Sequence, residues 1–314
     1  KYPKPSQDRF RFSLKDKSVL SEGVYVTMDV NRISDRYFLE DFAPQDFRRD
    51  PNPQSIFSMS RIGEHEALSL NIGAQLNRSF ASGTERLPEI LYERLAQPLR
   101  IGGMVYQGQT GAAWMRRNYP GANFDSLATG GLGAGLRDYD AFRFDSFHQW
   151  TVPKTFFGWL HSVPLAAVRG TYYSDSVAKG DTPGMIPQGG GLVRLSVQVG
   201  LELSVKFSRT WDEFEARRIG LDGLKHVIQP LIAWELVRSS SPALRVLPFD
   251  RVGYSSQLQP IRLGDFSSVD SITDWNVVRM GVRHAFKTRR DDDTIDWLVL
   301  ESTVDGYVQR PAYP

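Results

Sequence analysis

Residues 192–208 have the most regular polarity pattern in the chain, L-V-R-L-S-V-Q-V-G-L-E-L-S-V-K-F-S. Every odd position from Val193 to Phe207 is apolar, and every even position from Arg194 to Ser208 is polar or glycine. Because successive side chains of a strand point to opposite faces, this stretch predicts one strand with an apolar face and a hydrophilic face. Soluble strands usually have about 5–6 residues, whereas a tilted strand needs about 9–11 to cross a bilayer. The length therefore favours a membrane-barrel strand over its alternative, a long hairpin arm of a soluble β-protein.

The same two-residue period recurs along the chain. Gln54–Ile62 and Ala67–Asn77 predict one hairpin, and Trp275–Phe286 and Thr294–Gln309 predict another. Further strands are predicted at 22–31, 164–173 and 226–237, and a strand or a hairpin at 100–117. Residues 164–173 end in two tyrosines, which suit the aromatic girdle of a bilayer interface. About ten to fourteen strands result, joined by alternately short and long connections. The predicted fold is all-β: an antiparallel transmembrane β-barrel of the outer-membrane type, with residues 1–314 forming part of one barrel domain.

Four places fit the pattern less simply. Arg86–Leu99 combines a helical apolar stripe with prolines near both ends, and strand is preferred only because its neighbours are strands. In Ala141–Val152 the alternation slips near the middle, which predicts a β-bulge. Trp211–Gly223 is rich in charge and is expected to form a turn. Pro230 lies inside a predicted strand and indicates an edge, a bulge or a weakly paired position, because proline cannot donate to the ladder.

Composition narrows the functional classes. The 314 residues include 38 basic and 36 acidic side chains, so no bulk positive charge points to nucleic acid. No apolar run approaches the about 18 residues of a transmembrane helix, and a barrel needs none because its strands place only alternate residues in lipid. Without cysteine, a disulfide framework and a thiolate metal site are both impossible. Neither end resembles a natural terminus, so we expect a piece of a longer protein.

No catalytic or metal-binding constellation stands out. Residues 291–293, D-D-D, lack the ligand spacing of a calcium loop and favour a hairpin turn. Residues 130–135, G-G-L-G-A-G, lack the G-K-[ST] of a phosphate loop and favour a flexible loop. The histidines form no metal-binding motif, so we expect no enzyme and no cofactor; they are His65, His148, His161, His226 and His284.

The hydrophilic strand faces are better candidates for function. If they line an aqueous lumen, two roles are possible. They would only keep the lumen surface hydrated, or Arg194 or Lys206 would also attract the phosphate of a lipid headgroup. The residues expected to face the lumen are Arg194, Gln198, Glu202, Lys206, Arg279 and Arg283.

Several short motifs, in order, resemble those of the LptD family of lipopolysaccharide-assembly proteins, also called OstA or organic solvent tolerance proteins. Residues 34–42, S-D-R-Y-F-L-E-D-F, resemble the family's S-D-x-x-Y-(F/L)-x-D-(F/L). Residues 225–230, K-H-V-I-Q-P, resemble R-H-x-(L/I)-(E/Q)-P. Residues 247–250, L-P-F-D, and 265–272, D-F-S-S-V-D-S-I, resemble P-x-(F/L)-D and F-S-G-x-D-R-I. The matching residues carried over are Asp35, Tyr37, Asp41, His226, Pro230, Pro248, Asp250, Phe266 and Asp270.

Two positions depart from the family pattern: Ser268 where the family usually has Gly, and Ser271 where it usually has Arg. The resemblance implies a large closed barrel in the Gram-negative outer membrane that transports and inserts lipopolysaccharide. It also implies a lipoprotein plug resembling LptE in the lumen, and a periplasmic domain that receives lipopolysaccharide from a periplasmic bridge. The sugar part would cross the lumen, and the lipid part would leave between the first and last strands. That domain, the family's cysteines and the gate strands would lie outside this chain.

Two alternatives remain open from the sequence. One is another outer-membrane channel, such as a porin. The other is a secreted soluble carbohydrate-binding β-protein, in which the apolar strand faces meet in a core. On the barrel interpretation, an unclosed sheet exposes its edges, so we expect this chain alone to be unstable in water.

Overall fold

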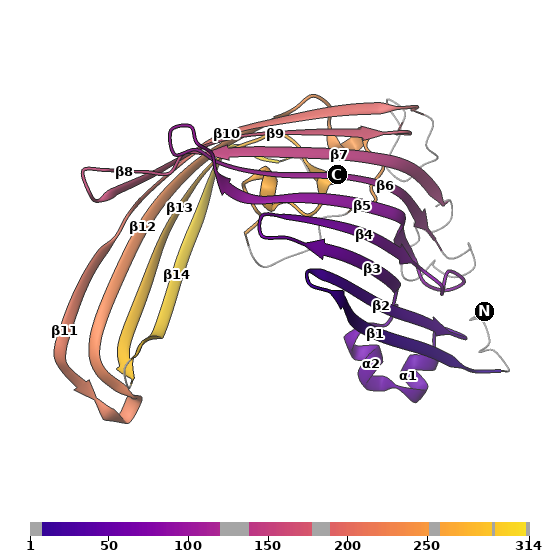
Figure 1. Cartoon of the computed structure of the whole chain (residues 1–314), viewed down its shortest axis with the longest axis horizontal. Helices are drawn as coiled ribbons and strands as arrows, with labels where there is room; N and C mark the ends of the chain where they lie inside the picture. The colour runs from indigo at the N-terminus through magenta and orange to yellow at the C-terminus, as the bar shows by residue number, and fades with distance from the viewer. Residues whose placement is uncertain (1–7, 120–137, 178–188, 251–257, 291–292, 312–314) are drawn as a thin grey trace.

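The computed structural model describes residues 8–119, 138–177, 189–250, 258–290 and 293–311. Within these residues the chain forms one antiparallel sheet of 14 strands, with two short α-helices beside its first hairpin (Figure 1). No helix among the described residues is both long and apolar enough to cross a membrane. The strands are β1 (Arg11–Ser21), β2 (Val24–Ile33), β3 (Ser55–Ile62), β4 (Glu66–Ala74), β5 (Gly83–Pro98), β6 (Val105–Asn118), β7 (Tyr139–Thr151), β8 (Lys154–Phe156), β9 (Leu160–Tyr173), β10 (Leu192–Val205), β11 (Phe207–Ala216), β12 (Leu221–Ser239), β13 (Trp275–Arg290) and β14 (Asp293–Gln309); the helices are α1 (Phe38–Phe42) and α2 (Pro44–Arg49).

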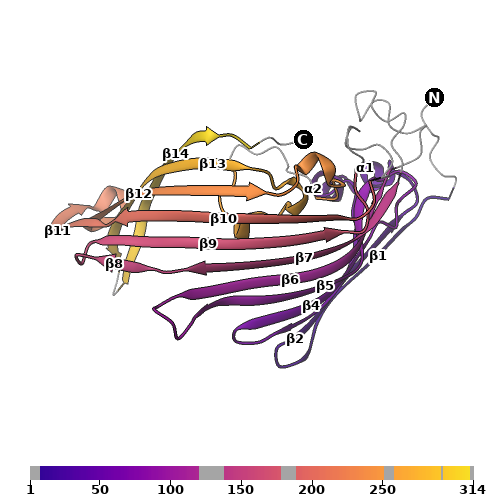
Figure 2. The ribbon, with the colours of Figure 1, turned by 90° about the horizontal axis from the view of Figure 1, so that it is seen from above.

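The strands follow one another across the sheet almost in chain order. The path runs from β1 to β7 and then through β9, β10, β12, β13 and β14, while β8 pairs with β9 and β11 pairs with β12. Figure 2 shows them side by side in one curved layer whose edge strands are β1 and β14. This is the up-and-down antiparallel order of an outer-membrane barrel, in an open sheet.

The connections differ in length between the two ends of the strands. Those at one end are short: 22–23, 63–65, 99–104, 157–159 and 217–220. Those at the other end are long: 34–54, 75–82, 119–138, 174–191 and 240–274. In outer-membrane barrels the short turns face the periplasm and the long loops face outward.

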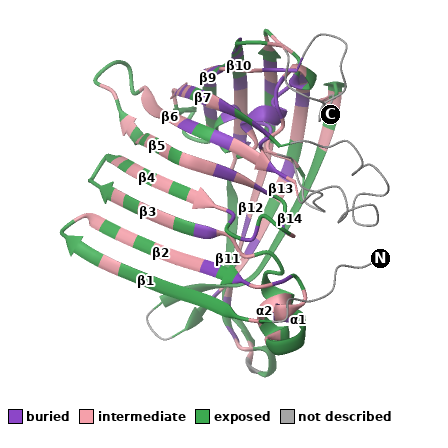
Figure 3. Ribbon diagram, turned by 90° about the vertical axis from the view of Figure 1, so that its right-hand side faces the viewer, coloured by how far each residue is buried: buried purple, intermediate pink, exposed green. Residues whose placement is uncertain are grey.

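The longest connection lies against the sheet. Residues 240–274, here called the inner segment, contain three short 3₁₀ turns, Ala243–Arg245, Leu263–Asp265 and Val269–Ser271. Its described residues, 240–250 and 258–274, pack on the concave face, where the buried positions of the sheet gather (Figures 1 and 3). We call this face of the sheet inner and the opposite face outer.

The sheet bends between β10 and the group β11 to β14 (Figure 1), and β12 changes its partner strand around Pro230. β10 and β11 pair with different halves of β12: Ser204 pairs with Leu231, and Phe207 pairs with Ile228. Gln229 and Pro230 therefore have no partner on that side, which agrees with the missing N–H of proline. On the other side Pro230 pairs in register with Val282 of β13.

Most strand predictions are confirmed. Both predicted hairpins form, as β3–β4 and β13–β14, and the ambiguous stretch Arg86–Leu99 belongs to strand β5. Strand β1 was missed, because charged residues interrupt the alternation in R-F-S-L-K-D-K-S-V-L-S. The predicted glycine loop at 130–135 and the turn at 291–292 lie outside the described residues.

Three predictions were wrong. Ala141–Val152 contains no bulge: β7 pairs with β6 and β9 without a register shift, and Phe147 lies on the inner face because it packs under the inner segment. Trp211–Gly223 is not all turn, since β11 continues to Ala216. Of the two tyrosines that end β9, only Tyr172 lies on the outer face, whereas Tyr173 is fully buried on the inner face.

Candidate functional site

The two faces of β10 have the reverse polarity of a soluble strand. The apolar side chains point outward into open space: Val193 is 69% exposed and Leu195 48% exposed. The polar side chains are the buried ones: Arg194 and Gln198 are each 1% exposed, beneath the inner segment. Since burying polar groups is costly unless they are hydrogen-bonded, the partners of these side chains identify what the inner face is built to hold.

Gln198 pairs with the backbone of the inner segment as a neighbouring strand would. Its Nε2 donates to the carbonyl of Ile261 at 3.3 Å, and its Oε1 accepts from the N–H of Leu263 at 2.8 Å. The intervening Arg262 reaches back to the sheet, donating to Glu235 at 3.2 Å and to Glu202 at 2.6 Å. These contacts hold residues 261–263 against β10 and β12.

A second anchor lies around Asp270. Its Oδ1 accepts hydrogen bonds from the Tyr173 hydroxyl at 2.6 Å and from Arg143 Nη1 at 3.1 Å, and its Oδ2 accepts from the N–H of Asp250 at 2.8 Å. Arg143 also pairs with the Asp250 carboxylate. Arg194 donates Nη1 to the carbonyl of Asp270 at 3.1 Å. Two arginines and a tyrosine of the sheet thus hold both ends of the segment's 250–270 span.

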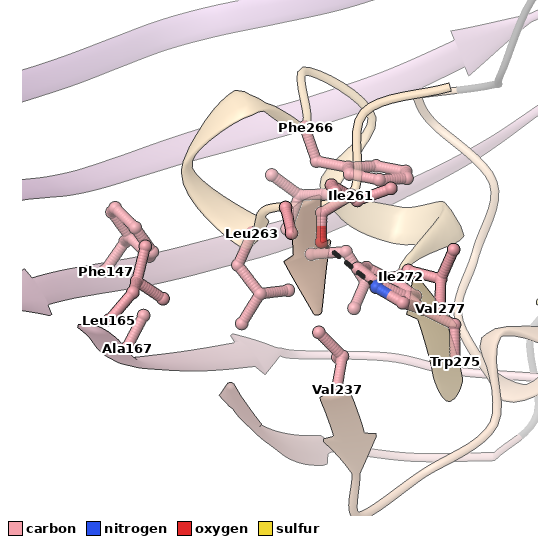
Figure 4. Close-up of a cluster of buried hydrophobic side chains, with 12 residues drawn as sticks. Phe147, Leu165, Ala167, Val237, Ile261, Leu263, Phe266, Ile272, Trp275 and Val277 are labelled. Atoms are coloured by element: carbon pink, nitrogen blue, oxygen red, sulfur yellow. Dashed lines mark hydrogen bonds between the residues drawn. The ribbon is translucent and has the colours of Figure 1, made fainter. Parts of the chain in front are cut away.

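An apolar core fills the space between these anchors (Figure 4). Phe266 stacks on Trp275 with ring centroids 5.2 Å apart, and Trp275 donates its indole N–H to the carbonyl of Ile261 at 3.0 Å. Apolar side chains on the inner face of the sheet complete this core: Phe147, Leu165, Ala167, Ala233, Val237 and Val277. The inner segment is therefore a packed part of the fold, fixed by both polar and apolar contacts.

A cavity of about 390 Å³ lies beside this core, between the segment and strands β5, β6, β7 and β9. Arg169 spans its floor, pairing with Asp145 at 3.1 Å and donating to the carbonyl of Leu263 at 3.0 Å. Charges of both signs and amides line it, including Arg86, Gln109, Arg143, Asp145, Arg169 and Asp265. Such a lining suits sugar hydroxyls and phosphate oxygens, because it offers donors and acceptors together.

Four of the six residues predicted to face a lumen contact the inner segment. Arg194 and Gln198 do so directly, Glu202 through Arg262, and Arg279 by donating to the carbonyl of Gln259 at 2.7 Å. The other two lie apart from it: Lys206 is exposed between β10 and β11, and Arg283 pairs with Glu301 beyond the bend at 2.9 Å.

The motif at 34–42 forms a small structural unit around Arg9. Its guanidinium pairs with Asp35 at 3.0 Å and with Asp41 at 2.6 Å, and it lies 4.8 Å from the ring centroid of Phe42. The N–H of Tyr37 donates to Asp35 at 3.0 Å, which starts the turn into α1. Burial raises the pKa of Asp35, but hydrogen bonds from Arg9, its neighbour Ser34 and Tyr37 outweigh that effect and lower the pKa below the ordinary 3.8.

The remaining motif residues fall into two places. Pro248, Asp250, Phe266 and Asp270 all lie in the inner segment, where Pro248 accepts a hydrogen bond from the Tyr139 hydroxyl at 3.1 Å. His226 lies near the bend of β12, with its Nε2 3.0 Å from Nδ1 of His284. Within the part of the chain that the structure describes, no group of three or more metal-ligating side chains occurs.

Sequence reasoning missed the sheet residues that hold the inner segment: Arg143, Arg169, Tyr173 and Glu235. Each occurs in a strand with apolar residues on alternate positions. A charged side chain between two apolar neighbours in a strand indicates the face turned away from lipid. The sequence contained that signal for Arg143, Arg169 and Glu235. It contained no signal for their pairing with a distant loop, because that pairing depends on the loop folding back.

Aromatic side chains form two rows on the outer face. One row, toward the long loops, contains Trp114, Phe144 and Tyr172. The other, toward the short turns, contains Tyr106 and Trp150, whose rings are 5.8 Å apart, and Trp234. Trp114 and Tyr106 are eight residues apart on β6, roughly 26 Å along a strand. Two aromatic girdles bounding an apolar band are typical of outer-membrane barrels.

The comparison with known families agrees with this geometry. A model of the LptD family, described as LPS transport system D, matches residues 7–297. A search of curated proteins gave no match. The match covers most of the chain, and the sheet has the polarity and strand order that such a barrel requires. The chain therefore belongs to the LptD family, outer-membrane proteins of the lipopolysaccharide transport system.

Proposed function

We propose that this chain forms part of the wall of a barrel that moves lipopolysaccharide into the outer leaflet of the Gram-negative outer membrane, without catalysis. One observation supports this most directly: β10 exposes its apolar residues outward and buries its polar residues inward. A sheet of that polarity fits lipid on one side and an aqueous passage on the other.

On this proposal the inner face guides the polar part of lipopolysaccharide. The cavity beside the inner segment offers Arg86, Arg143 and Arg169 together with carboxylates and amides. Arginine can bind phosphate through two parallel hydrogen bonds, and the amide of Gln109 can serve sugar hydroxyls as donor and acceptor. Lys206 and Arg283 extend the same polar face toward the short-turn end.

The proposed assembly extends beyond this sheet. β1 and β14 leave unpaired backbone groups, which a lipid-embedded sheet must satisfy, so we propose that further strands complete one barrel and that the exit for the lipid part lies among them. A lipoprotein plug resembling LptE would occupy the lumen. A periplasmic domain and bridge components would deliver lipopolysaccharide to it.

Photo-crosslinking in living cells tests this function. The complete protein would carry a photoreactive amino acid at Gln109, which lines the inner cavity, or at Val197, which points outward from β10. We expect lipopolysaccharide adducts at Gln109 that require active export, and no export-dependent adducts at Val197. Absence of adducts at Gln109 in exporting cells, with free uptake of small solutes, would instead support a porin-like channel.

A further inference from the structure

The outer face contains a groove at the bend of the sheet. It has a volume of about 650 Å³, and most of the residues that line it belong to the outer face, as their cross-strand pairing shows. They come from five adjacent strands and include Leu160, Leu203, Ile232, Met280, Val282 and Val304. The lining is almost wholly apolar, so the groove suits a hydrocarbon chain.

The groove lies at the depth where a membrane would meet water. The aromatic row near the short turns reaches β12 at Trp234, and Ile232 and Pro230 follow it toward the short-turn end. β10 has 14 residues, more than the about 9–11 that a tilted strand needs to cross a bilayer. Leu203, near the end of that strand, therefore falls at the edge of the hydrocarbon layer, on the side of the periplasm.

Polar and cationic side chains follow immediately beyond the groove on the same face. Arg209 of β11 pairs in register with His226 of β12, and the guanidinium of Arg209 lies 5.1 Å from the ring centroid of Trp211. His226 in turn bonds to His284 of β13. Within the described residues Arg209 has no acidic partner, so its charge is available to an anion.

From this arrangement we propose that the bend is a binding site for one glycerophospholipid of the periplasmic leaflet. An acyl chain would occupy the groove between Leu203 and Met280. The phosphate would accept hydrogen bonds from Arg209, with His226 beside it. The proposal rests on the membrane placement of the outer face, which is part of the proposed function, but it concerns a resident lipid and not the transported one.

The position favours this occupant over the lipid part of lipopolysaccharide. On β9 and β10 the groove lies at the short-turn side, since Leu160 begins β9 and Val205 ends β10. That side faces the periplasm in outer-membrane barrels, whereas lipopolysaccharide is inserted in the opposite leaflet. The interrupted ladder also fits a position at the membrane–water interface. Gln229 and Pro230 have no strand neighbour on one side, and hydrocarbon cannot satisfy backbone groups, whereas water and the polar part of a lipid can.

The test uses the complete protein in vesicles that contain phosphatidylglycerol with a photoreactive group near the end of one acyl chain. Crosslinked peptides are mapped and quantified by mass spectrometry. Met280→Trp fills the groove, with Val197→Trp as its control elsewhere on the outer face. Arg209→Gln removes the cation, with Arg94→Gln as its control, because Arg94 also lies over an outer-face ring, that of Tyr106 at 5.9 Å.

We expect labelling of the groove residues well above that of Val193–Val199 on the outer face of β10. Arg209→Gln should reduce it about tenfold, the scale of one lost charge-assisted contact. Met280→Trp should reduce it at least as much by filling the groove, while the two controls leave it unchanged. Equal labelling along the whole outer face, insensitive to both variants, would mean ordinary boundary lipid and overturn the site alone. If Val193–Val199 were not labelled at all, the outer face would not meet lipid. That result would overturn the membrane placement, and with it the proposed function.

Discussion

The hydroxyl of Tyr173 on β9 donates a hydrogen bond to Oδ1 of Asp270 in the inner segment, at 2.6 Å. The same carboxylate pairs with Arg143 of β7 and caps the N–H of Asp250, so it joins two wall strands to two distant points of one loop. All of these partners are buried or nearly so. In such surroundings the loss of the Asp270 charge leaves Arg143 with one carboxylate partner, Asp250, and weakens two further hydrogen bonds, which makes the contact a sensitive point of the fold.

We expect Asp270→Asn to detach the inner segment from the wall. Breaking a buried ion pair by removing one partner typically costs about 3–5 kcal/mol. The cost here should lie near the lower value, because Arg143 keeps the Asp250 carboxylate while Tyr173 and the N–H of Asp250 lose a charged acceptor. Limited proteolysis of the complete protein should then cut within residues 240–274, and cells should admit large antibiotics that the parent excludes. Asp212→Asn, on the exposed strand β11, is the control. An uncut segment in Asp270→Asn would contradict the anchoring role.

Gly200→Ala should loosen the other anchor. A Cβ at Gly200 would collide with the Glu235 carboxylate, which holds Gln198 and Arg262 in place. Displacing Glu235 should cost about 1–3 kcal/mol, as expected when buried polar groups lose their partners. Gly170→Ala is a matched control, because a Cβ there meets nothing within 4 Å. Hydrogen exchange at residues 261–263 should speed up in the first variant only; equal rates in both would rule out this coupling.

A charge introduced on β4 should affect the free energy of unfolding differently on the two faces of the strand. Leu70 lies on the outer face, and its neighbour Ser69 lies on the inner face. Leu70→Arg should destabilise the folded protein in bilayers by about 2–4 kcal/mol, because the charge would enter the hydrocarbon layer. Ser69→Arg should change the free energy of unfolding little. Urea titration in vesicles measures both, and equal effects would show that the faces are assigned wrongly.

The ion pair between Arg9 and Asp35 should be lost in acid. Because Asp35 has a pKa below 3.8 in the folded state, its contribution to stability is fully present above pH about 4 and disappears as the pH falls through the folded pKa. We expect the protection of amides 35–42 from hydrogen exchange, measured relative to the intrinsic exchange rate at each pH, to fall selectively below that pH. Asp35→Asn should show the lower protection already at pH 7. Protection in the parent that does not change with pH would contradict the ion pair.

Much of the sheet could be predicted because its information is local. Alternation along one strand fixed the two faces of β10, and two-residue periodicity located both hairpins. Strand β1 escaped because its charges break the period, and the bulge at Phe147 was inferred wrongly because an apolar residue on the inner face looks like a slip when no partner is known.

The inner segment could not be predicted in the same way. Its motif residues, such as Asp250 and Asp270, were recognised from their resemblance to the family, but their partners Arg143 and Tyr173 lie about a hundred residues away in the chain. Such pairings are set by the loop folding back on the sheet. Single-strand patterns carry no information about that step.

The central claim is that the outer face of β10 meets lipid and the inner face does not. Spin labels placed singly at each position from Val193 to Val205, in the complete protein reconstituted in bilayers, test it most directly. The account predicts that labels at odd positions are accessible to oxygen and not to a nickel chelate, with Val197 at the centre of the pattern. Labels at even positions should not report lipid. If odd positions were instead inaccessible to both reagents, they would be packed in a protein core, and the membrane barrel would be contradicted.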